Sequence, residues 1–88
     1  MDFYGRIKEI LPEVTGTSER GTWTRQTVVV ESFDNPNNIL AIDAINDRVK
    51  LLHPVQPGHA VKVTFGVSSR KGENGYFTSV NLWDIQKL

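Results

Sequence analysis

The side chains that most often carry out catalysis are present in this sequence, but they are not spaced for it. His53 and His59 lack a Ser, Asp or Glu at the spacing of a catalytic relay or a metal site. The segment from Thr15 to Ser18 contains hydroxyl groups, but it is neither a nucleophile elbow nor a phosphate-binding loop. The absence of cysteine excludes a thiol nucleophile and a cysteine-ligated zinc ion. We therefore predict a protein that is not an enzyme and has no cofactor or metal site.

The sequence instead contains aromatic and cationic residues of the kinds that bind single-stranded nucleic acid. Aromatic rings stack on unpaired bases, and cations spaced along a groove contact the phosphates. The candidate binding residues fall in two predicted strands and in the two loops expected to flank a binding face. They are Tyr4, Arg6, Lys8, Arg20, Trp23, Arg25, Arg70 and Lys71.

Each of these residues also has a simpler explanation. Trp23 could cover the core or lie in a subunit interface, where tryptophan is enriched. Arg6 and Lys8 could protect an edge strand from mispairing, and Arg70 and Lys71 could be ordinary residues of a hairpin tip. The alternative function is therefore a protein-interaction or assembly module that binds no nucleic acid.

The overall charge favours this alternative. Ten Lys and Arg residues balance ten Asp and Glu residues, whereas nucleic-acid binders usually carry a basic excess. A local basic strip can still attract phosphate while acidic residues elsewhere cancel the total charge.

Apolar and polar residues alternate in five short segments, which is typical of antiparallel strands. The predicted strands run from Asp2 to Leu11, Thr22 to Ser32, Ile39 to Ile45, about Val61 to Val67, and Tyr76 to Gln86. A change of parity between Ile7 and Ile10 predicts a bulge in the first strand. One parity is expected to form the core: Ile7, Val28, Val30, Leu40, Ile42, Val61, Val63, Phe65 and Val80. Trp83 shares the parity of Ile85 and is expected to be structural.

Turn-forming residues separate these strands. We expect loops at Val14 to Gly21, Phe33 to Asn38 and Ser68 to Gly75. A short helix is expected from Asp47 to Leu52, capped by the side chain of Asn46 or Asp47.

Three strands, a short helix and two further strands follow the order of a five-stranded Greek-key barrel of the OB type. An SH3-like barrel could use the same strands but usually lacks a helix at this place. We predict an all-β OB fold in which residues 1–88 form a single domain. Such a small core leaves a narrow margin of stability and exposed aromatics favour association, so we expect a homo-oligomer.

We expect the cytoplasm as the compartment. A chain without cysteine fits a reducing environment. It also contains no run of 18 apolar residues, and the segment from Met1 to Tyr4 does not begin like a secretion signal.

Residues 39–83 resemble a single-stranded-DNA-binding protein of the bacterial type. The resemblance is carried by an apolar third strand, a helix with Val49 and Leu52, and a series of features in a fixed order. That series is Pro57-Gly58, Val61-Lys62-Val63, Gly66, Arg70-Lys71 and Tyr76-Phe77-Thr78. The sequence departs from that family in its neutral charge, in a third strand without an outward aromatic residue, and in lacking a long acidic tail. We therefore expect no general role in coating genomic DNA.

The whole chain is more similar still to a family of short bacterial proteins catalogued as a domain of unknown function and grouped with these OB folds. The matching features are Gly5, Ile7, Thr15-Gly16-Thr17-Ser18, Trp23, Arg25-Gln26, Phe77-Thr78, Val80 and Trp83. This resemblance implies a fold, and only by analogy does it imply binding of single-stranded DNA.

Overall fold

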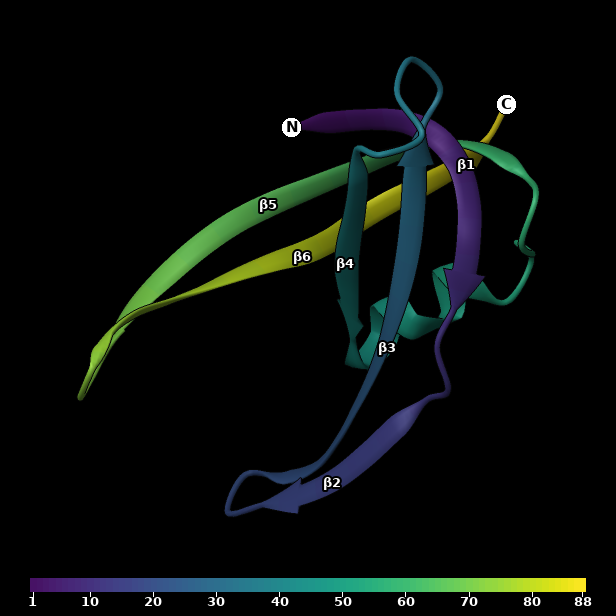
Figure 1. Cartoon of the computed structure of the whole chain (residues 1–88). Coiled ribbons are helices and arrows are strands. Elements are labelled where there is room, and N and C mark those ends of the chain that lie inside the picture. Colours follow the sequence, from purple (N-terminus) through teal and green to yellow (C-terminus); the bar gives the residue numbers. More distant parts are fainter.

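The computed structural model describes all residues from Met1 to Leu88 as six β-strands and one short 3₁₀ helix (Figure 1). The elements in chain order are β1 (Asp2–Ile10), β2 (Val14–Ser18), β3 (Gly21–Ser32), β4 (Ile39–Ile45), η1 (Asn46–Leu52), β5 (Ala60–Gly72) and β6 (Gly75–Lys87). The turn predicted at Phe33 to Asn38 joins β3 to β4 and is confirmed.

Five of the strands close into a barrel. They are ordered β1-β5-β6-β4-β3, and β1 also pairs with β3, so the sheet returns to its first strand. Its pairs are antiparallel except for β4 and β6, which meet in parallel at Asp43 and Asn81. With η1 between β4 and β5 in the chain, this arrangement confirms the predicted OB fold. β2 lies outside the ring and pairs only with β3.

Apolar side chains from all five barrel strands, together with Val49 and Leu52 of η1, fill the barrel in one cluster. Seven residues of the predicted core are buried: Ile7, Val28, Val30, Ile42, Val61, Val63 and Phe65. The other two, Leu40 and Val80, are only partly buried and pack against this cluster. β6 instead contributes Leu82 and Ile85 as its buried residues.

β1 bends in order to pair with two neighbours. The part from Asp2 to Arg6 pairs with β5, and the part from Gly5 to Ile10 pairs with β3. The register shifts between Ile7 and Glu9, which confirms the predicted bulge. Where the two pairings overlap, a Cβ on Gly5 would collide with the Glu31 carbonyl, so this close approach requires glycine.

The segment expected to be a loop at Val14 to Gly21 is instead a strand and a tight turn. β2 pairs with β3, from Val14 opposite Arg25 to Ser18 opposite Gly21. Gly16 was expected to lie in this loop. In the structure it lies within the strand, directly opposite Trp23.

The expectation of a loop at Ser68 to Gly75 was also wrong. β5 and β6 stay paired as far as Gly72 opposite Gly75, and only Glu73 and Asn74 form the turn. The hydroxyl groups of Ser69 and Thr78 lie 2.9 Å apart across the pair. Both faces of this hairpin are solvated, so polar residues that would disfavour a core strand are compatible with it.

η1 begins without the predicted side-chain cap from Asn46 or Asp47. Asn46 adopts a positive φ of 52°, and its Oδ1 accepts a hydrogen bond from the amide of Thr24 at 3.0 Å. Its side chain thus extends the β3–β4 pairing past Arg25 and Ile45, the end of the ladder. η1, the only helix of the structure, is too short to cross a membrane.

Candidate functional site

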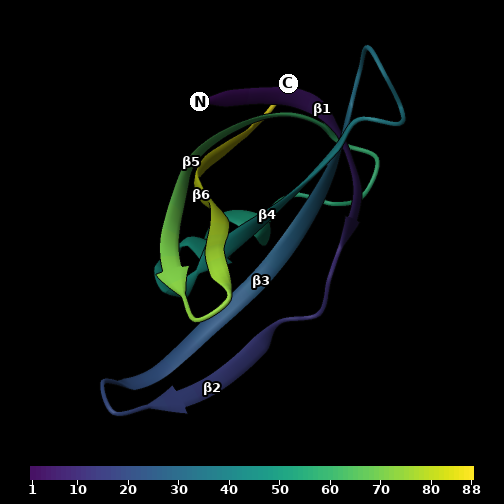
Figure 2. The same cartoon turned by 60° about the vertical axis from the view of Figure 1, so that its left-hand side comes forward.

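Two hairpins extend beyond the barrel. The β2–β3 arm comprises residues 14–24, and the β5–β6 arm comprises residues 66–80. Both arms leave the barrel toward the same side in two views of the molecule (Figures 1 and 2). They therefore flank a shared surface of the sheet.

That surface, called the outer face below, consists of the side chains that point away from the core on β3, β4, β6 and β5. Side chains alternate along a strand, so Thr27 lies on the side opposite to the buried Val28. The register continues this face from Thr27 to Asp43, from Asp43 to Asn81, and from Asn81 to Gly66. Its members include Trp23, Arg25, Thr27, Asp43, Gly66, Ser68, Arg70, Phe77, Ser79, Asn81 and Trp83.

Trp23 lies on the outer face where the β2–β3 arm leaves the barrel. It is half-buried, and its indole occupies the space that a Cβ on Gly16 would fill. Arg25 follows two residues later on the same face and is exposed. The two predicted binding residues of β3 are thus placed side by side along one strand.

Trp83 lies on the same face at the root of the β5–β6 arm. It is 53% exposed, and its indole covers Gly66 of β5. Trp83 was expected to point to the same side of the strand as Ile85, and this expectation is wrong. The register shifts here, because Asp84 pairs with Thr64, whereas Leu82 pairs with Phe65. Trp83 is the extra residue of this bulge, so Ile85 and Leu82 can both be buried while the indole points outward.

Phe77 and Arg70 form a second aromatic and cationic pair, near the tip of the β5–β6 arm. They are direct cross-strand partners, and the ring of Phe77 occupies the space of a Cβ on Gly72. Phe77 is 58% exposed. Between this pair and the barrel lies a shallow pocket of about 270 Å³. Its lining is mostly polar: Ser68, Ser69, Arg70, Phe77, Ser79 and Asn81.

Two further predicted cations lie on the arms but not on the outer face. Lys71 is paired with Tyr76, and alternation places both on the opposite side of the arm from Arg70. Arg20 lies in the two-residue turn at the tip of the β2–β3 arm and is exposed. Arg20 is thus at the end of this arm, beyond the paired residues.

The remaining predicted residues, Tyr4, Arg6 and Lys8, are exposed on β1. β1 lies between β3 and β5 in the ring, across the barrel from the contact of β4 with β6. The structure therefore separates these three residues from the outer face.

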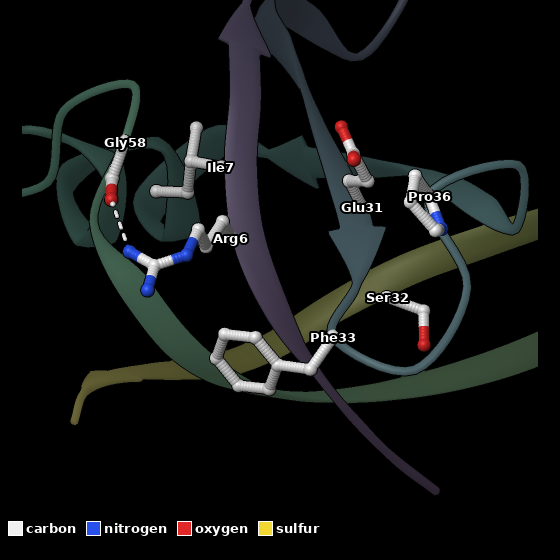
Figure 3. Close-up of a pocket in the computed structure, with 7 residues that line it drawn as sticks. All are labelled: Arg6, Ile7, Glu31, Ser32, Phe33, Pro36 and Gly58. Atoms are coloured by element: carbon white, nitrogen blue, oxygen red, sulfur yellow. Dashed lines mark hydrogen bonds between the residues drawn. The ribbon is translucent and has the colours of Figure 1, made fainter.

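Arg6 has partners of its own on that far side. Its guanidinium carbon lies 5.7 Å from the centre of the Phe33 ring, and its Nη1 donates a hydrogen bond to the Gly58 carbonyl at 3.4 Å (Figure 3). These residues line an open pocket of about 270 Å³ together with Glu31. The carboxylate of Glu31 thus shares this pocket with the guanidinium of Arg6.

A hydrogen bond between side chains links β3 and β4 on the outer face. Asp43 accepts a hydrogen bond from the Thr27 hydroxyl at 2.6 Å. The Nδ1 of His59, away from this face, accepts a hydrogen bond from the amide of Gln56 at 3.1 Å. No three His, Cys, Asp or Glu residues are gathered in a way that could hold a metal ion.

Phe77 and Trp83 lie on this face but were not among the predicted binding residues. Phe77 follows the residues that were assigned to a loop, and the bulge hid the orientation of Trp83. The signal that could have identified both is the placement of a glycine on the partner strand, since Gly66 and Gly72 each lie under one of the two rings.

Comparisons with known proteins agree with this architecture. A family model described as "Domain of unknown function (DUF3127)" matches residues 2–86. Among solved structures, the chain is similar to the mitochondrial single-stranded DNA binding protein Rim1 of S. cerevisiae, with a TM-score of 0.66 and 22% sequence identity. The match covers 100% of this chain and 92% of that one. No curated protein matches the sequence.

Proposed function

We propose that this chain, which belongs to the DUF3127 family, is a nucleic-acid-binding OB module that takes a single strand, most simply DNA, across its outer face. The observation that carries the proposal is the gathering of exposed aromatic rings and arginines on one surface between two arms. In OB folds, the equivalent strands and the loops at these two positions bind oligonucleotides. Rim1, which has the same fold, is a single-stranded DNA binding protein.

The chemistry of this surface suits an unpaired strand better than a duplex. Trp83 and Phe77 each expose more than half of their surface, and unpaired bases can stack on such rings with little dependence on sequence. Arg25 and Arg70 lie beside the rings, where they can contact phosphates. The formal net charge of zero is compatible with binding of a single strand, because the phosphates interact with the charged residues near them rather than with the total charge of the chain.

The salt dependence of binding is the first test. We expect fluorescently labelled oligo-dT to bind in an anisotropy titration near 50 mM salt and to dissociate as salt is raised, because each neutralised phosphate releases counterions. Arg70→Ala should reduce the slope of log K against log salt by roughly 0.7, the value for one contact with a single strand. Lys8→Ala, on the far side of the barrel, is the matched control and should leave the slope unchanged. Wild-type protein that gives no anisotropy change with oligo-dT would defeat the proposal.

The alternative, an assembly module that binds no nucleic acid, is favoured by one observation. The opposite side of the β5–β6 arm exposes the apolar surface of Val67 and Tyr76, and Tyr76 is 73% exposed. Side chains of this kind are common in protein interfaces.

Self-association is compatible with both functions, and we expect a homodimer or a higher oligomer. Burying exposed aromatics in a second copy would add to the small core of one chain. Light scattering at micromolar concentration measures the mass directly, and the mass of a single 9.9 kDa chain would exclude self-association.

A further inference from the structure

The three aromatic residues of the outer face share one structural feature, which is a glycine directly beneath the ring. The pairs are Trp23 over Gly16, Trp83 over Gly66, and Phe77 over Gly72. Gly16 is the direct partner of Trp23, whereas Gly66 and Gly72 lie diagonally from their rings. In all three pairs, a Cβ at the glycine would overlap carbon atoms of the ring.

Taking this together with the proposed function, on which the inference rests, we propose that Gly16, Gly66 and Gly72 are positioning residues for nucleic-acid binding. Each lets one face of an aromatic ring settle onto the backbone of the neighbouring strand. The other face remains open to solvent as a preformed stacking platform. The glycines do not touch the nucleic acid and act only through the rings.

The exposure of the rings supports this geometry. Trp83 and Phe77 are 53% and 58% exposed, so a large part of each residue stays open to solvent, whereas Trp23 is more covered. A ring held in this way loses little rotamer freedom when a base stacks on it, and such preorganisation lowers the entropic cost of binding. An exposed ring above an ordinary side chain would have to be immobilised by the ligand itself.

The spacing of the glycines also constrains the ligand. Gly66 and Gly72 are six residues apart on β5, which is roughly 20 Å along a strand. Stacked neighbouring bases are only about 3.4 Å apart. Trp83 and Phe77 therefore receive bases that are not neighbours in the strand, and we expect dinucleotides to bind far more weakly than oligo-dT of about 12 nucleotides.

Ring geometry can be measured in the free protein, independently of any ligand. A proton above an aromatic face has its NMR resonance moved upfield, so the Hα resonances of Gly16, Gly66 and Gly72 should lie upfield of those of other strand glycines. Unshifted resonances would overturn the inference whatever the protein binds.

The functional test is a double-mutant cycle on Gly66 and Trp83. Gly66→Ala should displace the indole, since the new Cβ occupies its position, and should weaken oligo-dT binding by about fivefold or more with an unchanged salt slope. Adding Gly66→Ala to Trp83→Ala should cause no further loss, because there is no ring left to displace. Thr78→Ala, on the opposite side of the β5–β6 arm and under no ring, is the control for a small substitution.

The outcomes separate the inference from the proposed function. If wild-type protein binds oligo-dT and Gly66→Ala binds equally well, the inference is wrong and the proposed function stands. If wild-type protein does not bind, the proposed function and this role of the glycines both fail, although the upfield resonances remain. If Gly66→Ala does not fold, Gly16→Ala with Trp23→Ala is the equivalent cycle in an arm outside the barrel, and additive losses there would overturn the inference.

Discussion

Replacing Val63 with Asp should abolish the cooperative thermal transition of this protein. Val63 is 0% exposed, between β1 and β6 at the centre of the barrel. A carboxylate there would have no partner, and the cost of several kcal/mol would be comparable to the roughly 5 kcal/mol of stability that a domain of this size has. Circular dichroism on heating measures the transition.

Val67→Asp is the matched control for this substitution. It makes the same chemical change four residues later on β5, where the side chain is exposed on the arm. We expect this variant to unfold at nearly the temperature of the wild type. A Val63→Asp variant with an intact transition would show that the assignment of the barrel interior is wrong.

Replacing Trp83 with Ala should weaken binding of oligo-dT by about 1 to 3 kcal/mol, or roughly 5- to 140-fold, while the fold is retained. The indole is the largest exposed ring of the outer face, and the core residues beside it, Leu82 and Ile85, are left untouched. Trp23→Ala should have an effect in the same range, although its ring is more covered. Fluorescence anisotropy gives the affinity, and the thermal transition reports on the fold.

Tyr4→Ala provides the comparison for an aromatic residue outside this face. Tyr4 is half exposed on β1, away from both arms, and its loss should leave the affinity unchanged. Equal losses for Trp83→Ala and Tyr4→Ala would mean that binding uses both sides of the barrel. No loss for Trp83→Ala would exclude the outer face as the site.

The barrel was predictable because its core obeys a simple rule. Val28 and Val30, like Val61 and Val63, are alternate apolar residues of central strands, and the packing they imply is the packing observed. The bulge in β1 was equally visible, because Ile10 has the wrong parity relative to Ile7. Local alternation is sufficient where a strand has one buried side and its alternation can be followed without an undetected bulge.

The arms were not predictable by the same rule, because both of their sides face solvent. Polar residues from Ser68 onward gave no alternation that could distinguish a strand from a loop, although their backbone pairing continues to Gly72. Gly16 was misread because a glycine in a turn and a glycine beneath a ring are identical in sequence. The bulge at Trp83 reversed the parity of β6, because the consecutive residues Thr64 and Phe65 of β5 pair with Asp84 and Leu82 and leave Trp83 unpaired.

For this reason the site was predicted only in part. Trp23, Arg25 and Arg70 lie on the outer face as residue types and loop positions suggested. Tyr4 and Arg6 have the same residue types, but β1 carries them to the other side of the barrel. Residue type indicates what a side chain can bind, and only the order of strands around the barrel indicates which side chains can act together.

The closure of the barrel by β1 also determines when the chain can fold. Phe3 lies opposite Val63, and the amide of Phe65 donates a hydrogen bond to the Met1 carbonyl, so the start of β1 cannot pair fully until β5 has been made. Contacts this distant in sequence carry a large cost of loop closure and are typical of domains that fold in milliseconds to seconds. The two arms, in contrast, are local hairpins that close within microseconds. Substitutions on the arms can therefore change what the protein binds without slowing the step that forms the barrel.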